Sequence, residues 1–421
     1  MARLAEISLG DKNFKKYKAL TPEIYKKTLK TAKLLRGRRI FHINSAARGG
    51  GVAELLRSQV ALERNLGLDS RWFVLKAGKK FFKTTKKIHN LLQGGNGRFL
   101  TRDGQKTYFN EIKTAARQFN KLISRQKPDI VLIHDPQPLP LIKILPDKTA
   151  SIFRIHIDLS KPNKKALELI RPMVEKFTQV ALTSRRYRPR WLGRKKAVFI
   201  MPAIDPFLEK NKKMPAYRAE DMLALFAINI DKPIISQVSR FDLWKDPLGV
   251  IRAYYLAKNK IPDLQLVLAG IMEASDDPEA KELFKKVRKH AEGDPDIFLF
   301  SKRSDLEGVP HSLFINALQT ASGAVLQKSI REGFGLTVTE AMWKKKAVVG
   351  GKAEGIKLQI KNGKNGFIAS GAEDMAEKIA RLIKNPALAH RIGGAARKTV
   401  KEKFLMSRLV FDHLKLYETL I

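Results

Sequence analysis

Short apolar runs alternate with amphipathic stretches along most of the chain. Residues 38–44 (RRIFHIN) form the first such run, and a turn containing three glycines follows it. Residues 52–67 then place apolar side chains at helical spacing, and residues 71–76 (RWFVLK) form a second short run. The order strand, glycine loop, helix, strand is typical of the start of a parallel α/β domain.

The same order begins again near the middle of the chain. Residues 234–238 predict a buried strand, which a polar turn over 239–246 and then a helix follow. Residues 205–230 are polar and contain Pro215, which favours a linker. At 421 residues the chain also exceeds the size of one ordinary hydrophobic core. We therefore predict an α/β protein with one domain over residues 1–206, a second over 207–395, and a helical segment over 396–421.

The first 37 residues are polar and predict a helical extension of the first domain. Ile24, Leu29 and Leu34 give this segment an apolar spacing close to that of a helix face. We expect a helix that lies on the first domain through these side chains.

The chain is strongly basic. Its 81 Lys and Arg residues against 41 Asp and Glu residues give a formal net charge of +40. Such a field attracts nucleic acids, acidic membranes and phosphorylated substrates, so a nucleic-acid-binding protein is an alternative. The basic residues are dispersed, however, and the sequence contains no zinc finger and no RNP-type aromatic motif. A solvated basic surface, with at most non-specific nucleic-acid binding, is the favoured interpretation.

Other features of the sequence exclude several classes of protein. The absence of cysteine excludes disulfides, thiol nucleophiles and cysteine-based metal sites. No apolar run reaches the length of a membrane span, and the first residues lack the apolar core of a signal peptide. The expectation is a soluble, cytoplasmic protein.

A glycine-rich stretch over residues 326–341 (LQKSIREGFGLTVTEA) carries the clearest candidate chemistry. Gly333 and Gly335 favour a loop that opens into a helix near Leu336, with Glu332 on the loop and Glu340 in the first turns of the helix. A helix N-terminus favours a diphosphate, and two carboxylates can accept hydrogen bonds from sugar or ribose hydroxyls. An ordinary strand-to-helix turn with solvated glutamates is the alternative for this motif alone.

Two cations follow the predicted strand over residues 234–238. Arg240 and Lys245 lie in its turn, and Lys328 lies close to the glycine-rich loop. A diphosphate gains negative charge as it leaves a sugar, and fixed cations that stabilise this charge lower the barrier.

Polar residues also follow three predicted strands of the first domain, where parallel sheets bind ligands. Arg154, His156 and Asp158 alternate over residues 150–163, so a strand would place all three on one face. An ion pair of Arg154 with Asp158 is the structural alternative. The remaining candidates are Gly49, Gly50 and Gly51 after the first strand, and His134, Asp135 and Gln137 after the strand over 130–133.

The glycine-rich stretch resembles the E-x7-E signature of GT-B glycosyltransferases of family 4. The wider segment LQKSIREGFGLTVTEAMWKKK, with GGGVAELL, HDPQP and SRFxxxK, is similar to the trehalose-forming transferases of that family. The resemblance implies the GT-B fold, in which two Rossmann-like parallel-sheet domains face a central cleft. It implies transfer of glucose from a nucleoside diphosphate glucose (NDP-glucose) to glucose, with retention of configuration.

The resemblance also implies the residue roles. His156 and Glu332 would orient the transferred glucose, while Arg240 and Lys245 would neutralise the diphosphate. The donor would be bound by Gly333, Phe334, Gly335, Leu336, Glu340 and Lys328. The acceptor would be bound by Gly49, Gly50, Gly51, His134, Asp135, Gln137, Arg154 and Asp158. In GT-B proteins the closing helix crosses back to the first domain, so residues 396–421 are expected to do so.

Several alternatives stay open at this stage. A trehalose phosphorylase or another hexosyltransferase of family 4 would carry an overlapping signature, and the base of the nucleotide and a homodimer are undecided. The sequence has no Asp-x-Asp motif of the kind found in metal-dependent transferases, so no metal or other cofactor is expected to be required, with Mg²⁺ at most accompanying the nucleotide sugar. Glu354 departs from the family pattern, because a glycine pair is expected before Ile356.

Overall fold

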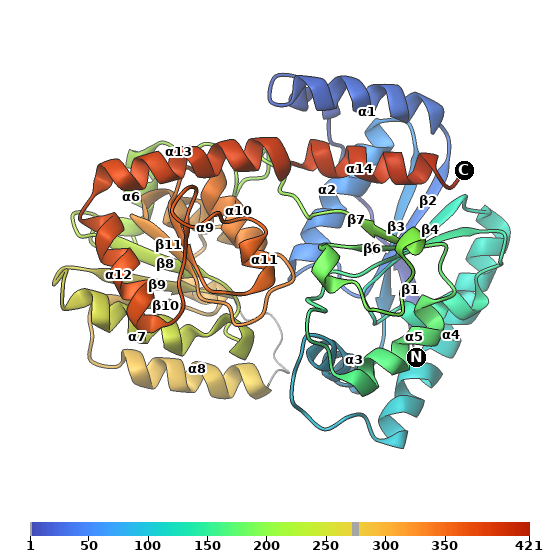
Figure 1. The fold of residues 1–421 in the computed structure, drawn as a ribbon, viewed down its shortest axis with the longest axis horizontal. Coiled ribbons are helices and arrows are strands. Elements are labelled where there is room, and N and C mark those ends of the chain that lie inside the picture. The colour runs from blue at the N-terminus through green and yellow to red at the C-terminus, as the bar shows by residue number, and fades with distance from the viewer. Residues whose placement is uncertain (1, 272–277) are drawn as a thin grey trace. The chain divides into compact units, whose positions relative to one another are not determined.

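The computed structural model describes residues 2–271 and 278–421, and its contacts divide the chain into two compact units (Figure 1). The first unit comprises Met1–Ala203 together with Met406–Ile421, and the second comprises Ile204–Leu405. The sequence predicts divisions after residues 206 and 395, whereas the contacts divide the chain after residues 203 and 405.

A seven-stranded sheet with the order β1-β3-β2-β4-β5-β6-β7 forms the centre of the first unit. Strand β1 pairs antiparallel with β3, and the other neighbours pair in parallel. The strands are β1 (Arg3–Glu6), β2 (Arg39–Asn44), β3 (Asp69–Lys76), β4 (Ile130–His134), β5 (Ala150–Arg154), β6 (Gln179–Leu182) and β7 (Ala197–Phe199).

Helices cover both faces of this sheet (Figure 1). They are α1 (Pro22–Leu34), α2 (Gly51–Asn65), α3 (Lys79–Leu92), α4 (Arg102–Gln126), α5 (Lys164–Val174) and α14 (Met406–Glu418). Short 3-10 turns are η1 (Phe14–Tyr17), η2 (Leu139–Ile144), η3 (Arg185–Tyr187) and η4 (Arg194–Lys196).

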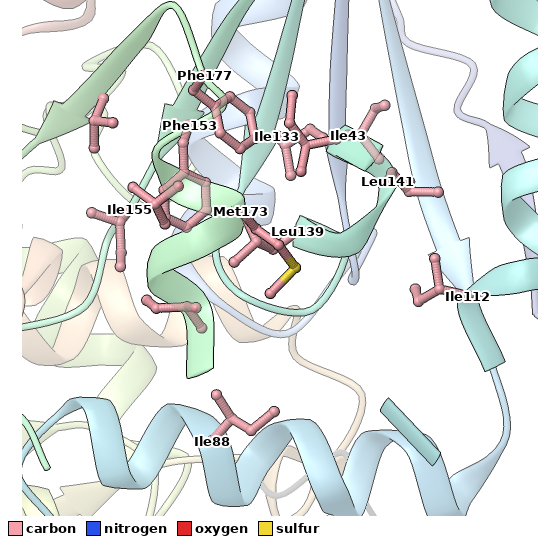
Figure 2. Close-up of a cluster of buried hydrophobic side chains, with 14 of the residues drawn as sticks. Ile43, Ile88, Ile112, Ile133, Leu139, Leu141, Phe153, Ile155, Met173 and Phe177 are labelled. Atoms are coloured by element: carbon pink, nitrogen blue, oxygen red, sulfur yellow. The ribbon is translucent and has the colours of Figure 1, made fainter. Parts of the chain in front are cut away.

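The strands are apolar on both faces because both faces are covered. In β3, Trp72 and Val74 pack with Leu56 and Val60 of α2 on one side, while Phe73 belongs to the larger core on the other. Figure 2 shows part of that larger core, where side chains from the central strands meet side chains from α3, α4 and α5. The labelled residues are Ile43, Ile88, Ile112, Ile133, Leu139, Leu141, Phe153, Ile155, Met173 and Phe177.

The N-terminal segment differs from the sequence prediction. It begins with strand β1, and its helix α1 buries Thr28, Thr31 and Ala32, not the predicted apolar side chains. Leu29 and Leu34 are 37% and 63% exposed. Helix α1 packs on α14, but the predicted apolar face was wrong, because Leu29 and Leu34 are exposed and do not form the buried face of the helix.

Strand β5 is also shorter than the alternating pattern predicts. It ends at Arg154, so His156 and Asp158 lie in the loop beyond it, and a common strand face for the three residues is wrong. The loop is held to the neighbouring strand, since the N–H of His156 donates to Oδ1 of Asp135 at 2.8 Å. Because the side-chain carboxylate takes this backbone hydrogen bond, the chain leaves the strand geometry here.

The second unit is built on a six-stranded parallel sheet with the order β10-β9-β8-β11-β12-β13. Its strands are β8 (Ile234–Val238), β9 (Gln265–Ala269), β10 (Ile297–Phe300), β11 (Ala324–Gln327), β12 (Val348–Gly350) and β13 (Phe367–Ile368). Its helices are α6 (Ala216–Ala224), α7 (Pro247–Lys258), α8 (Pro278–Ala291), α9 (His311–Ala321), α10 (Leu336–Trp343), α11 (Glu354–Lys357), α12 (Ala372–Ile383) and α13 (Pro386–Lys403). Two 3-10 turns are η5 (Leu243–Lys245) and η6 (Arg303–Leu306).

Two apolar cores lie on opposite faces of this sheet. Ile235, Leu266 and Leu326 point to the core formed with α7 and α12, while Ile234 and Val267 point to the core formed with α6 and α9. The sheet is thus fixed from both sides. The loops that follow β8 and β11 leave adjacent strands of it at the same edge.

Candidate active site

The glycine-rich loop of the second unit joins β11 to α10, as the sequence predicts. Glu332 lies on the loop, and its Oε2 pairs with Nζ of Lys245 from the turn after β8. Ser329 Oγ donates to the same carboxylate oxygen at 3.2 Å. Both side chains of the pair are largely buried, with 17% exposure for Lys245 and 13% for Glu332. The structure therefore brings together two residues that are 87 positions apart in the sequence.

A second ion pair connects the same two loops. Lys328 Nζ pairs with Oδ2 of Asp246, which also caps α7 by accepting from the N–H of Gly249 at 3.1 Å. Lys328 N–H donates to the side chain of Gln237 in β8 at 2.8 Å. Two cations and two carboxylates thus alternate at the ends of β8 and β11. This arrangement keeps the lysines in place while it balances their charge.

Arg240 lies apart from these pairs. Its side chain is 67% exposed, and Nη2 lies 3.0 Å from Oδ2 of Asp242 in the same turn. The same turn therefore supplies one largely buried cation, Lys245, and one solvent-exposed cation, Arg240.

The residues of the predicted donor loop are held by their backbone. Gly335 is the N-cap of α10 and has φ of 86°, a conformation that favours glycine. Gln359 Nε2 donates to the carbonyl of Phe334 at 2.5 Å and to that of Gly335 at 3.2 Å. The ring of Phe334 is buried against Phe404 at 5.4 Å between centroids. Gly333 is buried as well, and Leu336 begins the helix.

Two more glycines let this loop pass close to neighbouring backbone. A Cβ on Gly355 would lie 2.5 Å from the carbonyl oxygen of Glu332 and 2.6 Å from the nitrogen of Phe334. A Cβ on Gly351 would lie 2.8 Å from the carbonyl oxygen of Ser329. The N–H of Gly355 donates to the same carbonyl of Glu332 at 3.1 Å. Glycine at these positions therefore determines where Glu332 lies.

Glu340 lies in the second turn of α10 and is almost fully buried. Its side chain is 1% exposed, and Oε1 lies 2.5 Å from Nζ of Lys210, which is 18% exposed. A carboxylate at this depth needs a cation, because burial of an unpaired charge is costly. Lys210 supplies that cation from the segment before α6.

Glu354 does not stand unpaired at the start of α11. Its Oε1 lies 3.1 Å from Nζ of Lys357 one turn later, and its side chain is 19% exposed. Glu354, which stands where the family pattern has a glycine, is therefore neutralised by a lysine of its own helix.

In the first unit, the predicted acceptor residues gather where β4 and β5 end. Asp135 has φ of 61°, and its N–H donates to the carbonyl of Arg154 at 2.9 Å while its Oδ1 accepts from the N–H of His156. The rings of His134 and His156 are joined at 3.1 Å between Nδ1 and Nε2. Burial raises the pKa of Asp135 to about 7, against the lowering effect of the hydrogen bond from His156.

Arg154 and Asp158 do not form the alternative ion pair. Arg154 is 1% exposed and donates from Nη2 to the carbonyl of Ile200 at 2.5 Å. Asp158 is fully buried and accepts from the N–H of Ser160 at 2.8 Å. Burial lowers the pKa of Arg154 to about 9, which the nearby Asp135 opposes. Both side chains therefore fix the loop beyond β5.

The other acceptor candidates differ in character. Gly49, Gly50 and Gly51 are exposed at the start of α2, and Gly49 has φ of 77°. Gln137 is half-buried, and its Oε1 is enclosed without a hydrogen-bond partner among the residues that the structure describes. An enclosed amide oxygen without a partner is suited to a ligand hydroxyl.

Three residues of these sites were not found from the sequence. Lys210 lies 130 positions before Glu340, which it neutralises, so no local sequence motif indicates this ion pair. His42 and Glu63 lie behind His134, where Nδ1 of His42 is 3.3 Å from Nε2 of His134. His42 gave one signal, since it is a polar residue inside the buried strand β2.

Among residues 2–271 and 278–421, no group of three or more His, Asp or Glu side chains is arranged to hold a metal ion. No helix in the described part of the chain has the length and apolar character that crossing a membrane requires.

Two parallel α/β units with charged loops at strand ends define a glycosyltransferase of the GT-B class. The structure matches α,α-trehalose-phosphate synthase (UDP-forming) of Burkholderia xenovorans, solved with glucose 6-phosphate. The TM-score is 0.71 at 14% identity, covering 91% of this chain and all of that one. This confirms the fold class predicted from the sequence.

The chain belongs to the trehalose synthase family. Residues 42–189 match the family model of the trehalose synthase N-terminal domain, and residues 224–399 match that of glycosyl transferases group 1. Trehalose synthase of Pyrococcus horikoshii is 40% identical over 100% of this chain and 99% of its own length. Trehalose phosphorylase of Pleurotus pulmonarius is more distant, at 25% identity over 87% of this chain and 55% of that protein. The protein is therefore a trehalose-related glycosyltransferase.

Proposed function

We propose that this enzyme transfers the glucosyl unit of an NDP-glucose to the anomeric hydroxyl of glucose, forming trehalose and NDP with retention of configuration. The observation that supports this most directly is the charge arrangement of Lys245, Glu332, Lys328 and Asp246 at the ends of β8 and β11. It supplies two lysines for a diphosphate and a carboxylate for sugar hydroxyls. The B. xenovorans neighbour is described as UDP-forming, which supports a uridine nucleotide as one candidate donor.

In this mechanism the bond between the anomeric carbon and the diphosphate oxygen breaks, and the leaving phosphate takes the proton of the acceptor hydroxyl. The acceptor oxygen then bonds to the anomeric carbon on the face that the diphosphate leaves. Lys245, with Arg240, stabilises the charge that grows on the diphosphate, which lowers the barrier because the transition state gains more than the ground state. Lys328 adds to this field.

The carboxylates and the first unit position the sugars. Glu332 accepts hydrogen bonds from the transferred glucose, and Glu340, neutralised by Lys210, accepts from the ribose. In the first unit His156 contacts a sugar hydroxyl, and Gln137 Oε1 accepts from a hydroxyl of the acceptor. Positioning of this kind replaces a covalent nucleophile, since it holds the reacting atoms close together.

The test is NDP release by the purified protein from UDP-glucose or ADP-glucose, with and without glucose, followed by analysis of the sugar product. Release that depends on glucose, with trehalose formed, supports the proposal and identifies the nucleotide. Formation of glucose 1-phosphate from trehalose and inorganic phosphate, without activity on either nucleotide sugar, would establish a phosphorylase instead. That second candidate rests on the distant phosphorylase relatives.

A further inference from the structure

A line of three histidine rings leads from the sugar-facing residue His156 to a buried carboxylate. His156 Nε2 lies 3.1 Å from Nδ1 of His134, and Nε2 of His134 lies 3.3 Å from Nδ1 of His42. His42 Nε2 lies 3.0 Å from Oε2 of Glu63. Neighbouring rings are nearly parallel, with centroids 5.4 and 5.5 Å apart. This histidine chain connects four side chains through three hydrogen bonds.

The fold places the rings in a row because they come from adjacent strands. β2, β4 and β5 are neighbours in the sheet; His42 lies inside β2, His134 is the last residue of β4, and His156 lies two residues beyond β5. Glu63, His42 and His134 are buried, and only His156 of the four is half-buried. The histidine chain thus ends at the buried Glu63 on one side and at the partly exposed His156 on the other.

Glu63 is an anion that only accepts hydrogen bonds. Gln59 Nε2 donates to Oε1 at 2.8 Å, and the hydroxyl of Tyr417 donates to the same oxygen at 3.1 Å. Ser70 Oγ donates to Oε2 at 2.7 Å, beside His42. Burial by itself raises the pKa of Glu63, but the interactions with His42 and the hydrogen bond from Gln59 outweigh burial and lower the pKa to about 2. With His42, these donors satisfy both carboxylate oxygens.

His134 and His156 each carry one proton near neutral pH. Burial lowers the pKa of both His134 and His156 well below the usual 6.5, and the charge of Arg154 lowers both further. A neutral imidazole donates from one nitrogen and accepts at the other. Since Glu63 can only accept, His42 donates from Nε2, and a His42 ring with a single proton then accepts at Nδ1. The same direction then follows for His134 and for His156.

We propose that Glu63 is a positioning residue that fixes the tautomers of His42, His134 and His156, and so leaves Nδ1 of His156 as a hydrogen-bond acceptor for a sugar hydroxyl. This inference rests on the proposed function in assigning a sugar to His156. Among the described residues, Nδ1 of His156 has no hydrogen-bond partner, so it is available to a ligand. Without the carboxylate, the hydrogen bonds of the histidine chain can all reverse. His156 would then carry a proton on Nδ1 and could not accept a hydrogen bond from the sugar hydroxyl.

The first experiment is nitrogen NMR of the full chain labelled at histidine, near pH 7.5 and without substrate. Unprotonated Nδ1 and protonated Nε2 are expected for all three rings, assigned by single substitutions. A protonated Nδ1 on His156, as a doubly protonated His42 would cause, overturns the proposal. This measurement needs no variant of Glu63, so a folding failure of such a variant does not leave the proposal without a test.

The second experiment compares Glu63→Gln with Tyr417→Phe. The first variant removes the charge and keeps the shape, while the control removes one donor to Oε1 and keeps both the charge and the bond to His42. Glu63→Gln should give a protonated Nδ1 in part of the His156 population and lower kcat by ~10-fold or more, since a wrong tautomer cannot accept. Tyr417→Phe should keep the tautomers, and kcat should stay within about twofold, because the charge of Glu63 and its hydrogen bond to His42 remain. Equal kcat values in wild type and Glu63→Gln, with reversed tautomers, would overturn the proposal.

A third measurement separates this inference from the proposed function. Trehalose or UDP-glucose should shift the Nδ1 resonance of His156 when added to the wild type, whether or not turnover occurs. If the wild type transfers no glucose but shows the fixed tautomers and this shift, the proposed function fails and the histidine chain stands. If glucose is transferred and no ligand shifts Nδ1, the inference fails and the proposed function stands.

Discussion

Lys245 and Glu332 form an ion pair between the loops that follow β8 and β11, with Ser329 donating to the same carboxylate oxygen. One partner is assigned to the diphosphate and the other to the sugar. The site therefore already holds its cation and its carboxylate at neighbouring positions. A donor that enters must exchange this pairing for its own contacts, and each partner limits the freedom of the other.

Removal of the lysine should affect chemistry more than folding. Lys245→Ala is expected to lower kcat by ~10²-fold or more, because one charge-stabilising group of a leaving diphosphate is lost. The unfolding free energy should also fall, by about 1–2 kcal/mol, because Glu332 keeps the hydrogen bond from Ser329 but loses its cation in a largely buried position. Steady-state kinetics with the nucleotide sugar and urea denaturation test this. Arg252→Ala is the matched control, because Arg252 pairs with Glu373 on an exposed surface. An unchanged kcat for Lys245→Ala would remove the diphosphate assignment.

The buried pair of Lys210 and Glu340 allows a test of stability against function. Lys210→Met should destabilise the second unit by about 3 kcal/mol, because Glu340 is left buried without its cation. The double variant Lys210→Met with Glu340→Leu should recover most of that stability, since no buried charge remains.

The same double variant should not recover activity. Without the Glu340 carboxylate, the donor KM should rise by ~10-fold or more, the loss of one charged hydrogen bond. Chemical denaturation and donor-dependent kinetics give the two readouts. Recovery of both stability and donor KM would show that Glu340 does not bind the ribose.

Gly355 should be essential for the position of the donor loop. Gly355→Ala places a Cβ 2.5 Å from the carbonyl oxygen of Glu332, and this backbone contact cannot relax without displacing the loop. Activity should fall by ~10-fold or more, since a displacement of about 1 Å can cost 10²-fold. Gly394→Ala, in α13, is the control, because apart from the adjacent helix backbone no atom of the described residues lies within 4 Å of that Cβ. It should keep activity and gain about 0.5–1 kcal/mol of stability.

The stability of the first unit should fall as the pH drops below 6.5. Burial lowers the pKa of His413 to about 3, and those of His134 and His156 lie well below 6.5. Between pH 6.5 and the lowered pKa values, these histidines bind protons in the unfolded chain but not in the folded unit, so a fall in pH favours unfolding. Each such histidine contributes up to about 1.4 kcal/mol per pH unit. Asp135, whose pKa is raised to about 7, has the opposite effect and offsets one of the three histidines.

Urea midpoints between pH 7.5 and pH 5 measure this slope. His413→Gln should make the slope shallower, because one titrating group is removed. His290→Gln, at an exposed position, should leave it unchanged. A pH-independent midpoint for the wild type would contradict the buried neutral histidines.

Local patterns predicted the parts of the site that are made locally. The glycines around Phe334 required a loop, so Glu332 and Glu340 were placed correctly on the loop and in the helix. The apolar runs likewise predicted β2 and β8 because buried parallel strands are continuous in apolar residues.

The errors and omissions have physical causes as well. The alternation of Arg154, His156 and Asp158 imitated a strand, but a side-chain carboxylate from β4 takes the backbone hydrogen bond of His156 and ends the pairing. Lys210 and Glu63 act through tertiary contacts with residues far along the chain. A single sequence contains no local trace of such partners.

The assignment of Met406–Ile421 to the first unit has a consequence for protein synthesis. Helix α14 buries Leu409, Leu414 and Tyr417 against α1 and α2, and it leaves the ribosome only after the whole second unit. Until then the apolar surface of the first unit that α14 covers stays open, and Glu63 lacks the hydroxyl of Tyr417. The unit that is translated first is therefore the last to be completed, and a nascent chain stalled before residue 406 would expose this surface to chaperones.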